Sequence, residues 1–363
     1  MKWTDNLLLE GDAPEMRTRG QLQLSLYALH LSSGHNIYCG RIKSNTVEQY
    51  VFAASLFLSQ ATGVDMRKDL DSDTKMGHIL SPVYRELRRF ESIPDRREPY
   101  DTKMHTLARK VGKSSPPLGV IASLTDWFEQ GLLAGYRLSE FAQPSKRTNP
   151  LYPEIHLNPS IDVKTRAFVP NDIRVLTSGS RSAVGLDVLR YPVDTITKMW
   201  VKYRVQKNNQ NGEERAYAPN SAPDGYCFIH SMYRILTRYR DISRLDQRVS
   251  PAVTPLGLYW DPSAQQARLI TSTNIESYMR WLAAQVYHLD SSTDKDQLSK
   301  WGAHSLRVGA CVLLHAMGFS PIDIKWLLRW KSDAFMDYLR NVLLLSRRQN
   351  MALDKAATMP HVV

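Results

Sequence analysis

The stretch WGAHSLRVGA, residues 301–310, places a histidine and an arginine three positions apart among small side chains. Three residues are nearly one helical turn, so His304 and Arg307 project from the same face of a helix. Two cationic side chains held side by side repel each other, and this arrangement costs stability unless something anionic lies opposite. The stretch therefore predicts a helix that presents this pair to a negatively charged group.

The composition is that of an ordinary folded protein with a basic surplus. The 363 residues are 43% hydrophobic and 23% charged, which is enough for two or three domains with their own cores. Lys and Arg number 47 against 36 Asp and Glu, giving a net charge of +11. A surplus of this size favours an anionic partner such as nucleic acid or a membrane surface.

The cysteines and the N-terminus indicate the compartment. Cys39, Cys227 and Cys311 are far apart and form no CxxC pair, so neither a disulfide framework nor a zinc site is expected. Residues 1–16, MKWTDNLLLEGDAPEM, carry acids where a signal peptide has its apolar core. No window approaches the roughly 20 apolar residues that span a bilayer. We expect an intracellular, soluble protein without a membrane partner.

Hydrophobic periodicity predicts a mainly α-helical chain with a small antiparallel β-sheet, an α+β fold. Residues 72–80, SDTKMGHIL, are interpreted as a short helix, and residues 81–90, SPVYRELRRF, as another. The outer face of the second helix carries Arg85, Arg88 and Arg89. A solvated helix face explains any one of these arginines, but together they suit a face that rests on phosphates.

The stretch ESIPDRREPYD, residues 91–101, combines two prolines with dense charge and is interpreted as a linker. The expected organisation is therefore a helical N-terminal domain over 1–95, a larger domain over 96–350 and a tail over 351–363. Within the larger domain, longer helices are expected at 100–112 and 116–135. Residues 198–218, KMWVKYRVQKNNQNGEERAYA, predict a β-hairpin because polar and apolar residues alternate on both sides of NNQNG.

Two further residues, Arg137 and Tyr338, indicate a function only when they are considered together with the other motifs. Arg137 follows a helix-ending Gly135 in GLLAGYRLSEFAQ, where a surface arginine paired with Glu140 is the plainer explanation. Tyr338 lies on the last predicted helix, after a helix capped by Ser320, and on spacing alone a core aromatic explains it better than a functional one.

Together these residues resemble the tyrosine recombinases, the phage-integrase family. The resemblance covers roughly residues 97–350, and all six catalytic positions are filled in the family's order. They are Arg137 in GYRLSE, Lys207 in VQKNNQNGE, His304 and Arg307 in HSLR, Trp330 in LLRWKSD, and Tyr338. The fold that this implies is a helical core-binding domain followed by a tyrosine-recombinase catalytic domain.

The resemblance implies an enzyme that cuts and rejoins DNA strands. Tyr338 attacks a phosphodiester and forms a 3′-phosphotyrosine, while Arg137 and Arg307 neutralise the non-bridging oxygens, for which planar bidentate guanidiniums are suited. Lys207 protonates the departing 5′ oxygen. His304 donates to the phosphate or assists the proton transfer from the tyrosine.

The resemblance gives supporting roles to two more residues. Trp330 donates its indole N–H and packs on the tyrosine helix, and Glu140 steadies Arg137 or His304. No metal or other cofactor is expected, because the arginines supply the positive charge and no Asp, Glu and His cluster has ligand spacing.

The sequence departs from the family pattern at three points. The interval from Trp330 to Tyr338 is eight residues, one short of the commonest spacing, and the segment between Arg137 and Lys207 is long. Lys202 in the same hairpin is a rival for the lysine role. Lys207 is preferred because it lies at the turn end of the strand.

The expected partner is double-stranded DNA, with both domains closing around the duplex. Arg85, Arg88 and Arg89 are the expected contacts of the first domain, and Arg280, in the predicted helix TNIESYMRWLAAQ, that of the second. An apolar stretch beyond Tyr338 suggests that the tail docks on a neighbouring subunit in a homotetramer. The alternatives to a mobile-element recombinase are a type IB topoisomerase and a domesticated DNA-binding copy, and the intact set of six residues argues against the latter.

Overall fold

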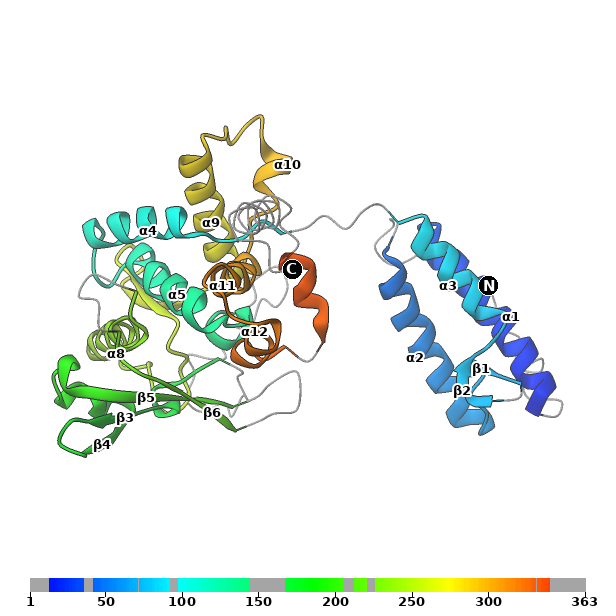
Figure 1. Ribbon diagram of the computed structural model, residues 1–363, viewed down its shortest axis with the longest axis horizontal. Helices are drawn as coiled ribbons and strands as arrows, with labels where there is room; N and C mark the ends of the chain where they lie inside the picture. The colour runs from blue at the N-terminus through cyan, green and yellow to red at the C-terminus, as the bar shows by residue number, and fades with distance from the viewer. Residues whose placement is uncertain are drawn as a thin grey trace, which may run out of the picture. The chain divides into compact units, whose positions relative to one another are not determined.

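The computed structural model describes residues 13–35, 42–70, 72–91, 97–143, 167–204, 212–220, 226–330 and 332–339. The chain divides into two compact units, Met1–Asp95 and Arg96–Val363, at the place where the sequence indicated a linker. Each unit has its own hydrophobic core. The described residues are mainly helical with small antiparallel sheets (Figure 1), which confirms the predicted fold class.

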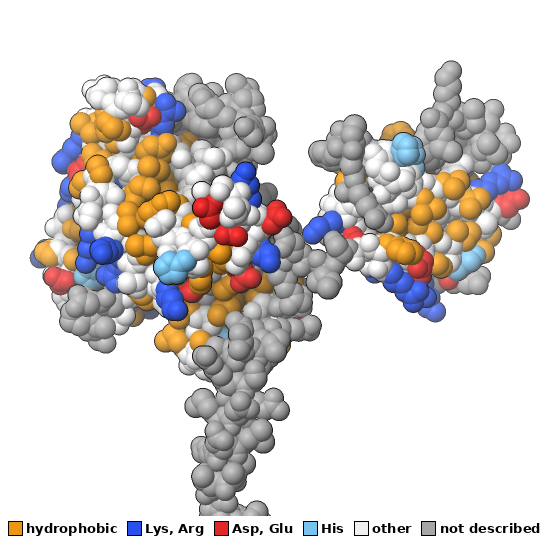
Figure 2. Space-filling view, turned by 90° about the horizontal axis from the view of Figure 1, so that it is seen from above, with side chains coloured by type: hydrophobic (Ala, Val, Ile, Leu, Met, Phe, Trp, Pro, Cys, Tyr) orange, Lys and Arg blue, Asp and Glu red, His pale blue; other side chains and the backbone are white. Residues whose placement is uncertain are grey.

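The first unit is built from helices α1 (Ala13–Ser32), α2 (Ser44–Thr62) and α3 (Leu80–Arg89) with a small hairpin, β1 (Lys68–Asp69) and β2 (Ser72–Met76). Its core includes residues with no exposed surface: Leu24, Ala28, Val47, Val51, Met66 and Leu80. Hydrophobic side chains also remain exposed on this unit, among them Leu22 on α1 and Phe57 on α2. Figure 2 shows such side chains gathered on its visible face.

The expected short helix over 72–80 is wrong. Ser72–Met76 is a strand, and Met76 pairs with Lys68 of β1 in antiparallel register. The Gly77 N–H also donates to the carbonyl of Arg67 at 2.7 Å. Pairing with a strand of only two residues overrides the local helical pattern.

The second unit is organised around helix α5 (Val120–Ala134), which is buried along most of its length. It contacts α4 (Thr102–Ser114), α8 (Phe228–Leu245), α9 (Ser272–Tyr287) and α11 (Ser305–Ala316). Figure 1 shows α5 with α4, α8 and α11 around it. Trp127 and Phe128 on α5 have no exposed surface, and their rings pack against Phe141 and Tyr278, respectively.

A four-stranded antiparallel sheet flanks these helices. Its strand order is β4 (Ser182–Val184), β3 (Ile173–Thr177), β5 (Ile196–Tyr203) and β6 (Glu213–Tyr217). Strands β5 and β6 are the predicted hairpin, with Tyr203 opposite Glu213 and Lys202 opposite Glu214. Short 3-10 turns precede and link the strands (η1, Pro170–Asp172; η2, Gly185–Arg190; η3, Val193–Thr195). A separate two-stranded hairpin is formed by β7 (Leu258–Asp261) and β8 (Gln266–Leu269).

The C-terminal elements form a small cluster of their own against α11. They are α12 (Pro321–Leu327), the turn η4 (Asp333–Phe335) and α13 (Met336–Leu339), while α6 (Leu138–Phe141) and α10 (Lys295–Leu298) are short helices elsewhere in the unit. The Ser320 hydroxyl accepts from the Asp323 N–H, which confirms the predicted cap of α12. The expected tail over 351–363 lies outside the described residues.

The small residues after Arg307 have a packing reason. A Cβ at Gly309 would lie 2.1 Å from the carbonyl oxygen of Tyr100, so only glycine lets α11 approach that backbone. The Tyr100 N–H donates to the Ser305 carbonyl at 2.9 Å, which ties the first turn of α11 to the segment before α4.

None of the described helices is both long and apolar enough to cross a bilayer.

Candidate active site

Arg307 lies at the centre of a buried arginine cluster. Its side chain projects from the first turn of α11, and the whole residue is only 4% exposed. The guanidinium donates to the Gly135 carbonyl at 2.6 Å, to the Leu328 carbonyl, and to the Arg329 carbonyl at 3.4 Å. Gly135 ends α5 in the left-handed conformation, with a φ of 59° that favours glycine. Arg307 therefore joins the ends of α5 and α12 to the start of α11.

Arg137 and Glu140 form the second part of the cluster. Arg137 precedes α6, and its N–H donates to Glu140 Oε2 at 2.9 Å. The Arg137 guanidinium lies 3.3 Å from Glu140 Oε1 and donates to the Arg329 carbonyl at 3.1 Å. The Arg137 side chain is 21% exposed and that of Glu140 only 3%. Glu140 thus steadies Arg137, one of the two partners expected for it, and no described contact links it to His304.

Arg329 is a member of this cluster that the sequence interpretation missed. Its guanidinium donates to both carboxylate oxygens of Glu140, at 2.8 and 2.9 Å, and stacks 3.7 Å above the Tyr203 ring. The available signal was its place in LLRW directly before Trp330, at the end of a predicted helix. A charged residue there is indistinguishable from a solvated helix end until the burial is known.

The phenol of Tyr338 lies beside His304. The Tyr338 hydroxyl and His304 Nε2 are 3.1 Å apart, so a proton can pass between them. Trp330 packs next to both rings, with centroids 6.2 Å from His304 and 6.1 Å from Tyr338. The Arg307 guanidinium stacks 4.3 Å from the centre of the Trp330 ring. The indole therefore joins the tyrosine helix to the arginine cluster.

The electrostatics of the cluster favour an anion. Arg137 and Arg329 both contact the Glu140 carboxylate, whereas the Arg307 guanidinium contacts backbone carbonyls and the Trp330 ring among the described residues. Burial, together with the charges of Arg137 and Arg329, lowers the pKa of Arg307 to about 9. This direction means that its positive charge is disfavoured in the protein alone, and a negative charge nearby would relieve the cost.

The His304 imidazole is affected in the same way. Burial lowers its pKa below the ordinary value of 6.5, and the charges of Arg307 and Arg97 act in the same direction. At neutral pH the ring is therefore neutral and one ring nitrogen is free to accept a proton.

Lys207 lies outside the described residues, whereas its rival Lys202 is described. Lys202 is exposed on β5, on the opposite face from the buried neighbours Val201 and Tyr203. Nearby Asp172 is buried, which raises the pKa of its carboxyl to about 6, although Val169 N–H, Arg204 and Lys202 act to lower it. Lys202 thus projects from the face of β5 opposite to Tyr203, whose ring lies against Arg329.

Comparison with known proteins gives structural counterparts only. No protein-family model and no curated protein matches the chain. Several solved structures are similar. The Tn1549 transposon integrase, in complex with transposon right-end DNA, has a TM-score of 0.41 at 11% identity, over 92% of this chain and 84% of its own. The XerH site-specific recombinase, bound to palindromic difH substrate, has a TM-score of 0.42 at 11% identity, over 95% and 77%.

The arginines expected to contact DNA differ in their surroundings. On α3, Arg88 pairs with Glu48 and Arg89 with Glu86, while Arg85 is exposed and makes no ion pair with another described residue. On α9, Arg280 is partly buried: its guanidinium donates to Glu276 at 3.2 Å and to the Trp301 carbonyl at 3.3 Å.

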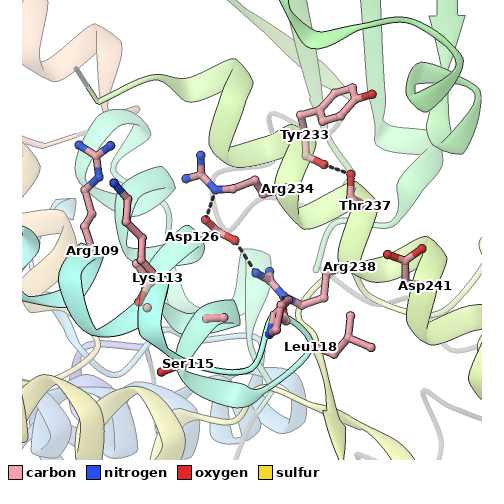
Figure 3. Close-up of a pocket in the computed structure, with 14 residues that line it drawn as sticks. Arg109, Lys113, Ser115, Leu118, Asp126, Tyr233, Arg234, Thr237, Arg238 and Asp241 are labelled. Atoms are coloured by element: carbon pink, nitrogen blue, oxygen red, sulfur yellow. Dashed lines mark hydrogen bonds and ion pairs between the residues drawn. The ribbon is translucent and has the colours of Figure 1, made fainter. Parts of the chain in front are cut away.

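A second arginine cluster lies apart from these residues. A pocket of about 530 Å³ between α4, α5 and α8 contains Arg109, Lys113, Arg234 and Arg238 (Figure 3). Asp126 lies between two of these arginines and accepts from each at 2.6 Å, as the dashed lines in Figure 3 mark. Because carboxylates neutralise its buried arginines, we do not assign the active site to this pocket.

The described residues include no group of three or more His, Cys, Asp or Glu side chains placed to hold a metal ion.

Proposed function

We propose that this protein is a site-specific DNA recombinase that cuts and rejoins DNA strands through a covalent 3′-phosphotyrosine. The observation that carries the proposal is the contact between the Tyr338 hydroxyl and His304 Nε2 at 3.1 Å, one helical turn from a buried arginine cluster. A nucleophile, a base and an excess of positive charge are the parts that attack on a phosphodiester requires.

The first role is neutralisation of the phosphate. A phosphodiester resists nucleophiles because its anionic oxygens repel them, so catalysis consists mostly of positioning and charge stabilisation. Arg137 is the more solvent-accessible guanidinium and Arg307 the more buried one. Held by backbone carbonyls, both are pre-organised to donate to the non-bridging oxygens as charge builds up in the transition state.

The second role is activation of the phenol. A free tyrosine has a pKa of about 10 and is a weak nucleophile at neutral pH. Neutral His304 accepts the phenolic proton as the Tyr338 oxygen bonds to phosphorus and the bond from phosphorus to the 5′ oxygen breaks. In the rejoining step a 5′ hydroxyl attacks the phosphotyrosine and the proton returns to the phenol. The phosphotyrosine link conserves the bond energy, so no ATP is needed.

The third role is protonation of the 5′ oxygen, which we propose for Lys207. Lys202 is the poorer candidate, because it is on the face of β5 opposite to Tyr203, whose ring contacts Arg329. A substrate with sulfur in place of the bridging 5′ oxygen separates the two, since a thiolate leaves without being protonated. The defect of Lys207→Ala should largely disappear on this substrate. If Lys202→Ala were the rescued variant, the assignment would pass to Lys202.

We further propose that both units contact double-stranded DNA inside the cell and that four copies assemble on it through the tail over 351–363. The net charge of +11 and the arginines of α3 and α9 support the DNA contact. The assembly is tested by measuring the mass of the protein–DNA complex. The full chain should give a tetramer on paired sites and a chain ending at 350 should give smaller complexes, whereas equal masses would contradict the role of the tail.

The proposed reaction is tested by trapping the covalent intermediate on a nicked suicide substrate. The wild-type protein should form an adduct that resists denaturation, and Tyr338→Phe should form none while it binds DNA as before. An adduct with Tyr338→Phe would show that the nucleophile is elsewhere. Sequencing the trapped junctions then separates the reaction classes: a defined pair of sites supports a recombinase, and scattered cuts with relaxation of supercoils would indicate a topoisomerase.

A further inference from the structure

Arg329 occupies a backbone position that does not suit an arginine. It directly follows the end of α12 with a left-handed φ of 56°. There the Arg329 N–H donates to the Trp326 carbonyl at 3.2 Å and the Trp330 N–H to the Lys325 carbonyl at 2.9 Å. This hydrogen-bond pattern ends helices most often at glycine, because a Cβ is strained in that conformation. An arginine here needs an interaction that offsets the strain.

The side chain provides that interaction. Both carboxylate oxygens of Glu140 accept from the Arg329 guanidinium, and the Tyr203 ring lies 3.7 Å beneath it. Burial favours the neutral form of the guanidinium, but the charge of Glu140 and the neighbouring Tyr203 outweigh it and raise the pKa of Arg329. Its guanidinium is buried and already donates to both oxygens of Glu140, so we do not assign it a DNA phosphate.

The backbone of the same residue serves the two other arginines. The Arg329 carbonyl accepts from Arg137 at 3.1 Å and from Arg307 at 3.4 Å, and the preceding Leu328 carbonyl also accepts from Arg307. The direction of these carbonyls is set by the left-handed turn. The contacts that hold this turn in place therefore also hold the two guanidiniums that are proposed to bind the phosphate.

We infer that Arg329 is a positioning residue for the proposed strand-transfer reaction, an inference that rests on the proposed function. Its side chain, held by Glu140 and Tyr203, keeps the turn after α12 in place. The carbonyls of that turn aim Arg137 and Arg307 at the scissile phosphate. Because Tyr203 is the last residue of β5, the same side chain also ties the lysine-bearing hairpin to the arginine cluster.

A double-mutant cycle tests whether Arg329 acts through Arg307. The measured quantity is the single-turnover rate of adduct formation on the suicide substrate at saturating DNA. Arg329→Met, which keeps the volume and removes the charge, should slow this rate by about 10²-fold, the scale of a misplaced catalytic group. In an Arg307→Ala background the same change should have a much smaller effect. Equal factors in both backgrounds would mean independent sites and would overturn the inference.

Two further variants separate the side chain from the backbone. Arg329→Gly keeps the left-handed turn without strain but removes the anchor, so it should be slowed to the same extent as Arg329→Met. Arg329→Lys keeps the charge without the planar two-point contact and should recover part of the rate. Wild-type cleavage by Arg329→Gly would show that the side chain has no positioning role.

A measurement without DNA keeps this inference distinct from the proposed reaction. In protein with ¹⁵N-labelled arginine, the Arg307 Nη nitrogens should give separate NMR signals while the guanidinium is held, assigned by comparison with Arg307→Lys. These signals should merge in Arg329→Met and stay separate in Arg238→Met, a matched buried arginine of the other cluster. Unchanged signals in Arg329→Met would contradict the positioning role. If the wild-type protein formed no adduct, the proposed reaction would fail while this measurement still decided the role of Arg329.

Discussion

The two arginine clusters of the second unit are built from the same residue types and differ in their balance of charge. Between α5 and α8, Arg234 and Arg238 share Asp126, and Glu129 also lies 3.3 Å from Arg234. In the candidate site, Arg137 and Arg329 contact Glu140, while the Arg307 guanidinium donates to the Gly135 and Leu328 carbonyls. Among the side chains that the structure describes, the first cluster has as many carboxylates as arginines, and the second has three arginines to one carboxylate.

The pKa shifts follow this difference. For Arg234, burial acts to lower the pKa, but Asp126 and Glu129 outweigh it and the net direction is upward. For Arg307, burial lowers the pKa and the neighbouring arginines lower it further, to about 9. A balanced cluster stabilises the fold, whereas an unbalanced buried cluster indicates a site for an anion. Each of the following predictions sharpens or breaks this distinction.

The largest expected effect is on the reaction. Arg307→Ala and Arg137→Ala should each slow adduct formation by about 10²–10³-fold, because each removes one donor from the phosphate. Arg234→Ala, measured on the folded fraction, should stay within a few fold of the wild type. A comparable rate loss from Arg234→Ala would remove the distinction between the clusters.

The next effect is on stability. Asp126→Asn leaves Arg234 and Arg238 without their shared charge, and should lower the free energy of unfolding by about 3 kcal/mol, the lower end for a broken buried pair. Denaturant unfolding measures this loss. Asp241→Asn, a change at a more exposed carboxylate on α8, the helix of Arg234 and Arg238, should shift this free energy by less than about 0.5 kcal/mol. Equal losses for the two variants would mean that Asp126 does not hold the cluster together.

His304 should produce an acid limb in the pH–rate profile of cleavage, in which the rate falls as the pH is lowered. Its pKa is lowered below 6.5 by burial and by Arg307 and Arg97, so it loses its ability to accept the phenolic proton only under more acidic conditions. At subsaturating DNA, cleavage should fall about tenfold per pH unit below that pKa. His304→Gln should be slower and lack this limb. A limb centred above 6.5, or one that persists in His304→Gln, would contradict the assignment.

The same pKa shift has a consequence for stability. Because the unfolded chain protonates His304 more readily than the folded protein, this residue contributes stability that is present above pH 6.5 and is lost as the pH falls below it. Unfolding measured without DNA isolates this contribution from the reaction, and His304→Gln should lose less stability than the wild type as the pH falls below 6.5.

The smallest expected effect is on the salt dependence of DNA binding by α3, whose arginines also differ in how far carboxylates balance their charge. Arg85 makes no ion pair with another described residue, whereas Arg89 pairs with Glu86 at 2.8 Å. A phosphate contact changes the slope of log affinity against log salt by about 1. Arg85→Ala should therefore reduce that slope by about this amount and Arg89→Ala by less. The reverse order would mean that the exposed ion pairs on α3 do not limit DNA contact.

Much of the fold could be predicted because the signals were local. Hydrophobic periodicity predicted α5, and the alternation of polar and apolar residues around NNQNG predicted the β5–β6 hairpin. Ser320 indicated where α12 begins. The strand Ser72–Met76 could not be predicted, because its partner β1 is too short to leave a pattern.

The candidate site divides in the same way. Its residues His304, Arg307 and Tyr338 were named from the resemblance to the family's motifs, but a motif does not reveal burial. Arg329 was missed for this reason, since its role depends on Glu140 and Tyr203, which lie far away in the sequence. Lys207 stays a prediction, because it lies outside the described residues.

The central claim is that the surplus charge of the Arg137–Arg307 cluster matches the negative charge of one phosphate. It is tested most directly by comparing cleavage of a normal phosphodiester with cleavage of a neutral methylphosphonate at the same position, by wild-type protein and by Arg307→Ala. The account predicts that the penalty of Arg307→Ala, about 10²–10³-fold on the phosphodiester, shrinks to a few fold on the neutral linkage. The same penalty on both substrates would show that Arg307 does not act by neutralising the phosphate.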